Sequence, residues 1–90
     1  MNIVEACIES RKEQMAICLT VQDHQIFFYP TRDSMAGTLL WVHDHWIPRW
    51  EPNYDDLTRS DYGLADLPDS PNKYYDAWNQ KWIDLDEVKE

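Results

Sequence analysis

The sequence predicts a small α+β fold in a single domain spanning residues 1–90. Two observations predict it: helix-capping pairs stand before apolar residues at helical spacing, and runs rich in β-branched and aromatic residues lie between them. A chain of 90 residues buries only roughly 60–65% of the surface that its unfolded form exposes, so the core is thin. Five Trp and five Tyr must supply much of the burial, and oligomerisation is a natural supplement.

The N-terminal third of the chain predicts a helix followed by a hairpin. Asn2, with Glu5 three residues later, is a capping-box pair, and the apolar residues after it recur at helical spacing. We therefore expect a short helix over residues 3–12. Residues 15–21 and residues 25–29 have strand character and are separated by a polar turn, which predicts a β-hairpin.

The middle of the chain predicts the rest of the sheet and a second helix. Residues 38–43 form a third strand candidate, whereas residues 46–52 contain two prolines and can only be an edge strand or an extended loop. Asn53, with Asp56 three residues later, predicts the cap of a short helix that ends at about Arg59.

The C-terminal segment predicts a third helix. Residues 64–71 have the composition of a turn-rich connector, and they end in Ser70 and Pro71, which suit the N-cap and the first position of a helix. At helical spacing Trp78 and Trp82 share one face with Tyr74 or Tyr75. We expect this aromatic helix to pack on the sheet or on a neighbouring subunit, with the two Trp side chains at the subunit interface.

The net charge of the chain limits the classes of molecule that it can bind. Seventeen acidic residues against eight basic ones give a net charge of −9, which disfavours binding to nucleic-acid phosphates or to an anionic membrane surface. No apolar run approaches the ~18 residues that a membrane span needs. The acidity is either a solvated surface or a mimic of DNA phosphates that a basic partner binds.

The two cysteines indicate a cytoplasmic protein. No secretory leader precedes them, and Cys7 and Cys18 each stand among apolar neighbours, so we expect buried thiols rather than a disulfide or a nucleophile.

The histidines are the only group typical of a metal site. His43 and His45 would face the same side of a strand, with His24 elsewhere in the chain, but the spacing supplies no third ligand, and we expect exposed strand histidines and no metal. Neither a nucleophile beside a base nor a glycine-rich phosphate loop stands out, so we expect no enzyme and no cofactor.

Aromatic residues are dense in the middle of the chain. Six of them lie between Phe27 and Trp50, in a stretch interrupted by prolines. Rings at a concave surface stack on nucleobases, and carboxylates accept hydrogen bonds from amines or ribose hydroxyls, so this composition suits a nucleoside. Packing in the core or at a subunit interface is the alternative for each ring.

A family resemblance gives this chemistry a context. Residues 50–62 match the closing signature W-x-P-x-x-x-D-L-x-x-x-D-W of a family of small phage and prophage proteins, with Tyr62 in the last place. The opening residues 3–6 are similar to that family's first helix. The family includes the second type of Thoeris anti-defence protein, a sponge for glycocyclic ADP-ribose. The chain differs in lacking the glycine and basic residues that usually follow the first helix, and the Arg-x-x-Trp after them, and in carrying a tail from about Leu64.

The resemblance implies a homotetramer, or a dimer, that holds a cyclic nucleotide or another ADP-ribose derivative between subunits in an infected bacterial cytoplasm. Matched position by position, it transfers ligand binding to Trp50, Pro52, Asp56, Asp61 and Tyr62, with Leu57 shaping the helix. The structural alternative is that Asp56 only caps its helix and Trp50 only fills the core.

An anionic ligand needs local positive charge on so acidic a chain. Arg49 and Arg59 stand in or beside the matching segment, with Arg32 upstream, and guanidinium groups clamp phosphates in bidentate fashion. The leading hypothesis is therefore a sponge that sequesters the signal without cleaving it. The alternatives are an acidic inhibitor or DNA mimic that binds a host defence protein, and, less favoured, a phosphodiesterase.

Overall fold

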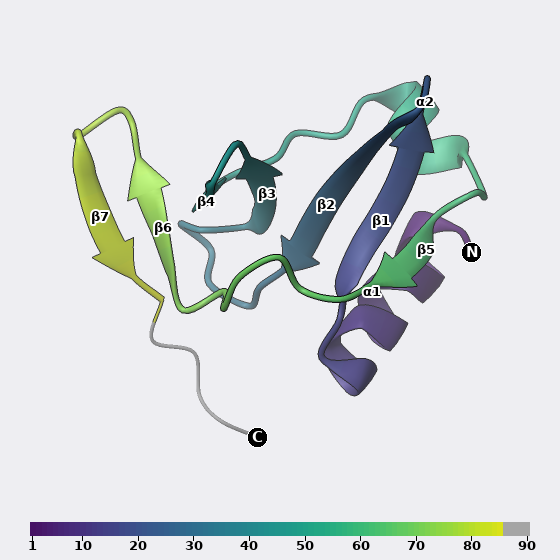
Figure 1. Cartoon of the computed structure of the whole chain (residues 1–90), viewed down its shortest axis with the longest axis horizontal. Coiled ribbons are helices and arrows are strands. Elements are labelled where there is room, and N and C mark those ends of the chain that lie inside the picture. The colour runs from purple at the N-terminus through teal and green to yellow at the C-terminus, as the bar shows by residue number, and fades with distance from the viewer. Residues whose placement is uncertain (86–90) are drawn as a thin grey trace.

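The computed structural model describes residues 1–85 and confirms the α+β class, with one antiparallel sheet at its centre (Figure 1). The elements are α1 (Ile3–Glu13), β1 (Ala16–Val21), β2 (His24–Pro30), β3 (Thr38–Val42), β4 (His45–Ile47), α2 (Tyr54–Thr58), β5 (Gly63–Ala65), β6 (Lys73–Asp76) and β7 (Lys81–Asp84). Five strands form the sheet in the order β4-β3-β2-β1-β5, and β6 and β7 pair as a separate hairpin.

Helix α1 begins as the sequence predicts. The Asn2 side chain accepts from the Glu5 N–H at 2.8 Å, and the Glu5 carboxylate accepts from the Asn2 N–H at 3.0 Å, so both halves of the capping box are made. The helix ends at Gln14, which adopts the left-handed conformation common after a last turn. Its buried face, Ala6 and Ser10, packs on the sheet.

The sheet keeps the predicted hairpin and third strand. Strands β1 and β2 pair from Ile17 opposite Phe28 to Val21 opposite His24. The two turn residues, Gln22 and Asp23, both have positive φ, as a two-residue type I′ hairpin turn requires. The proline-containing segment contributes only the short edge strand β4, in agreement with its prediction as an edge strand or loop.

Each face of the sheet carries its own core cluster, because successive strand residues point to opposite sides. On one face Ile17, Leu19 and Phe28 pack with Ala6 of α1 and with Tyr62. The opposite cluster contains six buried residues: Tyr29, Ala36, Leu39, Trp46, Tyr74 and Leu85. The C-terminal segment therefore covers the face that α1 does not.

The predicted C-terminal helix is wrong, and the predicted connector is partly wrong. Residues 63–65 form β5, which pairs with β1, and residues 73–84 form the β6–β7 hairpin. In Figure 1 this hairpin stands at the end of the molecule away from α1 and β5, beside β4. The Tyr and Trp residues share a face at helical spacing, but aromatic residues also favour strands, and in the hairpin Tyr75 and Trp82 become direct partners.

The turn of the hairpin has its own local cause. The Asp76 carboxylate is 4% exposed and accepts from the Trp78 N–H at 3.0 Å and from the Asn79 side-chain amide at 2.8 Å. An aspartate that bonds to backbone N–H groups ahead of it closes a turn and competes with a helix. These bonds, Asn79 foremost, lower the pKa of Asp76 below its usual range.

Candidate functional site

The residues that carry the family resemblance gather around α2. Asp56 occupies the third position of that helix, where its carboxylate accepts from the N–H of the N-cap Asn53 at 3.0 Å. In the reciprocal hydrogen bond, the Asn53 side chain accepts from the Asp56 N–H at 3.0 Å. The Asp56 side chain therefore completes a capping box, and its backbone carbonyl serves a second contact.

Tyr62 provides that contact. Its ring is 3% exposed, and its hydroxyl donates to the Asp56 carbonyl at 2.6 Å. Burial, and next the nearby Asp56 carboxylate, raise the pKa of Tyr62, so the hydroxyl remains a donor at neutral pH. The Tyr62 N–H also donates to the Met1 carbonyl at 3.1 Å. Together these bonds fix the segment after α2 against the start of α1.

Arg59 and Asp61 face each other at the surface beside this segment. The Arg59 Nε donates to Asp61 Oδ1 at 2.7 Å, and Nη2 donates to Oδ2 at 2.9 Å, which is the bidentate geometry of a guanidinium–carboxylate pair. Hydrogen bonding to Arg59 lowers the pKa of Asp61. A guanidinium has five N–H donors, so a third group can still bind its remaining edge.

The other three predicted residues lie in different surroundings. Trp50 packs on Phe28, with ring centroids 4.2 Å apart, against the same core cluster as Tyr62. Pro52 is exposed between β4 and α2. Arg49 lies away from α2: its Nη1 donates to the Met35 carbonyl at 2.9 Å, and its Nη2 is 3.8 Å from Asp76 of the hairpin. The structure thus brings together Asp56, Arg59, Asp61 and Tyr62 around α2, with Trp50 on the core cluster that Tyr62 shares, whereas Pro52 and Arg49 lie outside this group.

Apolar side chains remain in solvent on the two helices. Val4 and Ile8 of α1 are 64% and 61% exposed, and their spacing of four places them on one helix face. Tyr54 and Leu57 of α2 are 78% and 52% exposed. The two helices contact each other, and these four exposed residues are here termed the α1–α2 face. Apolar side chains gathered on neighbouring elements of a small protein can form an interaction site.

A second feature, which the sequence did not predict, lies between β4 and the β6–β7 hairpin. It is a cleft of about 170 Å³. The buried Trp46 lines it from the core side, and its indole N–H donates to the Asp69 carbonyl at 3.4 Å. The remaining lining residues are Asp44, His45, Asp69, Ser70, Lys73 and Trp82.

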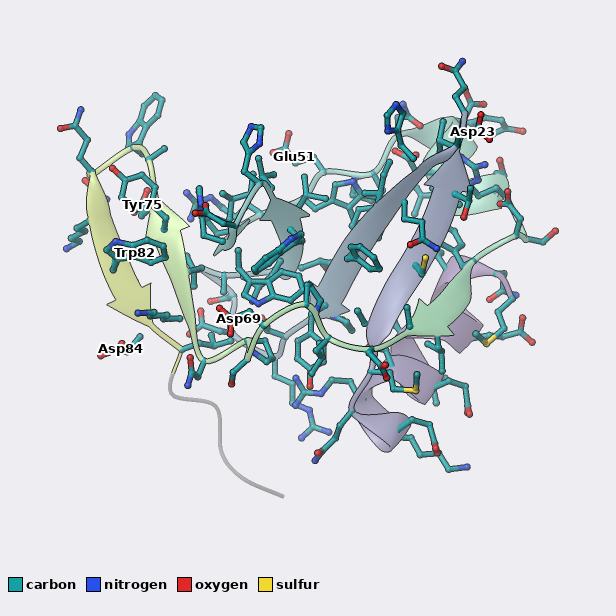
Figure 2. All side chains as sticks on the ribbon, viewed as in Figure 1. Asp23, Glu51, Asp69, Tyr75, Trp82 and Asp84 are labelled. Carbon is teal, nitrogen blue, oxygen red and sulfur yellow. The ribbon has the colours of Figure 1, made fainter. Side chains whose placement is uncertain are left out.

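Three rings hold one wall of this cleft in place. Tyr75 and Trp82 are paired directly across the hairpin, and their ring centroids are 5.2 Å apart. His45 of β4 lies 5.8 Å from Tyr75 and 5.6 Å from Trp82, with each pair close to perpendicular. Figure 2 shows Tyr75 and Trp82 together on the hairpin, with Asp69 in the segment that leads to it. Edge-to-face contacts of this kind orient aromatic rings.

The polar groups of the cleft carry both signs of charge. Asp44 and Asp69 supply carboxylates, and Lys73 places its ammonium 5.2 Å from the Trp82 ring centroid. His45 Nδ1 lies 3.0 Å from Asp44 Oδ1, and this hydrogen bond is the main cause of the lowered pKa of Asp44. The cleft therefore holds two carboxyl groups beside one amine-bearing side chain.

The mistaken helix explains why the cleft was missed. On a helix Tyr75 and Trp82 would be about two turns apart. In the hairpin they are direct cross-strand partners, and Lys73 and Asp84 occupy the next positions on the same face. The signal available in the sequence was a pair of short runs with aromatic or β-branched residues, 73–76 and 81–84, with the turn-forming Asp76 at the end of the first.

The structure also places the histidines and cysteines. His43 lies in the turn between β3 and β4 with φ of 59°, so the premise that it shares a strand face with His45 is wrong. Within residues 1–85, no three His, Cys, Asp or Glu side chains are arranged to hold a metal ion. Cys7 and Cys18 are free thiols and only partly buried, and burial raises the pKa of both.

Comparison with known proteins adds no relative. No family model, curated protein or solved structure matches the chain. Neither helix in the part of the chain described by the structure combines the length and the apolar composition needed to cross a bilayer.

Proposed function

We propose that this chain is a cytoplasmic binding protein of phage origin, which captures a cyclic or ADP-ribose-derived nucleotide between copies of itself and releases it uncleaved. The resemblance of residues 50–62 names the ligand class. The structural observation that carries the proposal is the α1–α2 face: apolar side chains lie exposed on the two helices that hold the matching segment. A second copy that covers this face would place two such segments near each other.

The contacts around α2 support a site completed by a neighbouring subunit. The Asp56 carboxylate and the Tyr62 hydroxyl are both engaged within the chain, and Trp50 is packed on Phe28. These groups shape the segment, and the surface beside it provides Arg59, whose remaining guanidinium donors face a ligand. In this proposal Arg59 binds phosphate while Asp61 orients it.

The first test is ligand capture. The purified protein is incubated with glycocyclic ADP-ribose and related cyclic nucleotides, free ligand is removed, and the protein is heated. The proposal expects one nucleotide to be released intact. Release of a cleaved product would replace capture by a phosphodiesterase activity, and release of none would favour the acidic, protein-directed inhibitor, whose binding to a basic partner falls steeply with salt.

The second test links capture to assembly. Ile8 is exposed in the single chain, so Ile8→Glu keeps the fold but places a charge in the proposed interface. We expect this variant to lose both the oligomer, measured by light scattering during gel filtration, and the retained nucleotide. Met35→Glu is the matched control, because Met35 is 66% exposed outside the α1–α2 face. An unchanged oligomer in Ile8→Glu would contradict the proposed interface.

Arg59 gives the third test. Arg59→Ala removes an exposed ion pair, which contributes little to folding, but also the phosphate donors. We expect weaker nucleotide retention with an unchanged unfolding midpoint, and no effect from Lys81→Ala, an exposed basic residue on β7. Arg49→Ala is informative as a contrast, because Arg49 bonds to Met35 and lies near Asp76 instead. Full retention in Arg59→Ala would remove the proposed phosphate contact.

A further inference from the structure

The β6–β7 hairpin stands at the end of the molecule away from α2 (Figure 1). The cleft lies between this hairpin and β4, and Asp69, Ser70, Lys73 and Trp82 of its lining belong to the tail that the resemblance does not cover. We propose that it binds a nucleobase bearing an exocyclic amine, presented as a nucleoside. This site goes beyond the proposed capture of a signal and does not depend on it.

The size of the cleft suits a single ring system. Its volume of about 170 Å³ lies below the ~300–1,000 Å³ typical of sites for drug-sized ligands. A base fits within such a space, while the sugar and anything attached to it remain in solvent. Trp82 is 52% exposed although its hairpin partner Tyr75 and His45 hold its ring, so one indole surface is fixed and accessible. A fixed ring costs little ordering on binding.

The walls favour a planar ligand. The His45 and Trp82 rings are inclined at 77° to each other. A flat ring that stacks on Trp82 therefore presents its edge to His45, which is the arrangement that aromatic quadrupoles prefer. The Lys73 ammonium rests over the Trp82 ring on a flexible stem. A bound base displaces it from the ring to the ligand edge, where it donates to a ring nitrogen or carbonyl.

The polar rim favours an amine. Asp44 and Asp69 supply carboxylate oxygens, which accept hydrogen bonds, whereas the Lys73 ammonium donates and cannot accept. Two carboxylates and one ammonium are satisfied together by an edge that carries an NH₂ group beside an acceptor, as adenine, guanine and cytosine do. Uracil has a carbonyl in the place of the cytosine amine, so its single N–H can serve only one carboxylate and its carbonyl would face the other unfavourably.

The charge of the cleft keeps phosphate outside it. Two carboxylates stand against one ammonium within the lining, on a chain with a net charge of −9. The potential there repels an anion, so the binding energy must come from the base and its stacking. A nucleoside, or a nucleotide whose phosphates extend into solvent, is the expected occupant.

The experiment is a titration of the whole protein with adenosine, cytidine and uridine, followed through the indole N–H signals of its five Trp residues. We expect saturable shifts of the Trp46 and Trp82 signals, with cytidine bound roughly tenfold more tightly than uridine, the scale of one good base-edge contact. No saturable shift, equal binding of cytidine and uridine, or the same shifts produced by glucose or free arginine would overturn the proposal.

Variants separate recognition from folding. Trp82→Ala should raise the Kd for adenosine by about 5- to 150-fold, the range for the loss of one base stack. Trp82→Phe retains a ring and should cost less, which guards against a disordered hairpin. Trp78→Ala is the control, since Trp78 is 91% exposed at the hairpin turn and does not line the cleft. Equal loss in Trp78→Ala would contradict a site at Trp82.

The carboxylates are tested by a change in preference. Asp69→Asn and Asp44→Asn each keep an acceptor but add an amide donor, so at least one should raise uridine affinity relative to cytidine. An unchanged cytidine preference in both variants would remove the carboxylates from recognition. Because the readout is nucleoside binding at Trp46 and Trp82, failure here leaves the capture test at the α1–α2 face unaffected, and the reverse holds too.

Discussion

Two aromatic residues, Tyr74 and Trp78, distinguish the predicted C-terminal helix from the observed hairpin. At helical spacing Tyr74, Trp78 and Trp82 share one face, so truncating Tyr74 or Trp78 should cost a similar amount. In the structure Tyr74 is 2% exposed within a core cluster, whereas the Trp78 side chain is 91% exposed at the turn. We therefore compare Tyr74→Ala with Trp78→Ala.

The expected difference is large. Replacing a buried large aromatic residue by Ala costs about 3–5 kcal/mol, against a total stability of roughly 5–15 kcal/mol for a small domain. A substitution at an exposed site away from special features stays within about 0.5 kcal/mol. Trp78 contributes a backbone N–H to Asp76, and this bond survives truncation of the side chain. Tyr74→Ala should therefore lose several kcal/mol of stability while Trp78→Ala loses almost none.

Urea denaturation of both variants, at two protein concentrations, is the assay. A loss of several kcal/mol in Trp78→Ala would refute the hairpin reasoning, because it would require the indole to be buried. If that loss grew larger at higher protein concentration, because mass action stabilises the wild-type oligomer more than the variant, the indole would be buried between subunits, as the sequence predicts for Trp78 and Trp82; otherwise it would be buried within the chain. The same pair of variants thus tests both ideas.

Two further predictions concern single hydrogen-bonded groups. Tyr62→Phe removes the donor to the Asp56 carbonyl and should lower the free energy of unfolding by about 0.5–1.5 kcal/mol in urea denaturation, while Tyr54→Phe, at an exposed ring, should change nothing. The lowered pKa of Asp76 means that its contribution to stability is present above about pH 4 and is lost as the pH falls through the lower folded-state value. The Tm difference between wild type and Asp76→Asn should therefore shrink on acidification, and a difference that stays constant from pH 7 to pH 2 would contradict this role.

The parts of the fold that the sequence predicts are those with one dominant local signal. Asn2 and Glu5 specify the start of α1, and Asn53 and Asp56 specify α2, because each capping pair satisfies backbone donors without help from the rest of the chain. The β6–β7 hairpin fails for the opposite reason. Its aromatic residues fit a helical period, but in the hairpin Tyr75 and Trp82 share one face and Tyr74 points to the other. The choice depends on Asp76 and on burial of Tyr74 against strands far away in sequence.

The candidate sites divide along the same line. The motif around α2 is contiguous in sequence, so matching it predicts a group that the structure does bring together, with Tyr62 bonded to Asp56 and Arg59 to Asp61. The cleft is lined by His45 and by residues between 69 and 82. Its lining depends on the β6–β7 strand pairing, in the segment where the sequence predicts a helix. Local motifs can be read without a fold, whereas a site assembled across a sheet edge cannot.

The tail from about Leu64 is part of the core and not an appendage. Phe28 and Tyr29 of β2 point to opposite faces, and each needs a cover: α1 and Tyr62 protect the first, while Tyr74 and Leu85 protect the second. Removing the tail would expose Tyr29, Leu39 and Trp46 together. We expect this to destabilise the chain strongly, because a domain of this size buries little apolar surface in total. The same burial fixes the hairpin beside β4 and so creates the cleft. A chain that gained this tail for stability would therefore have gained the second site with it.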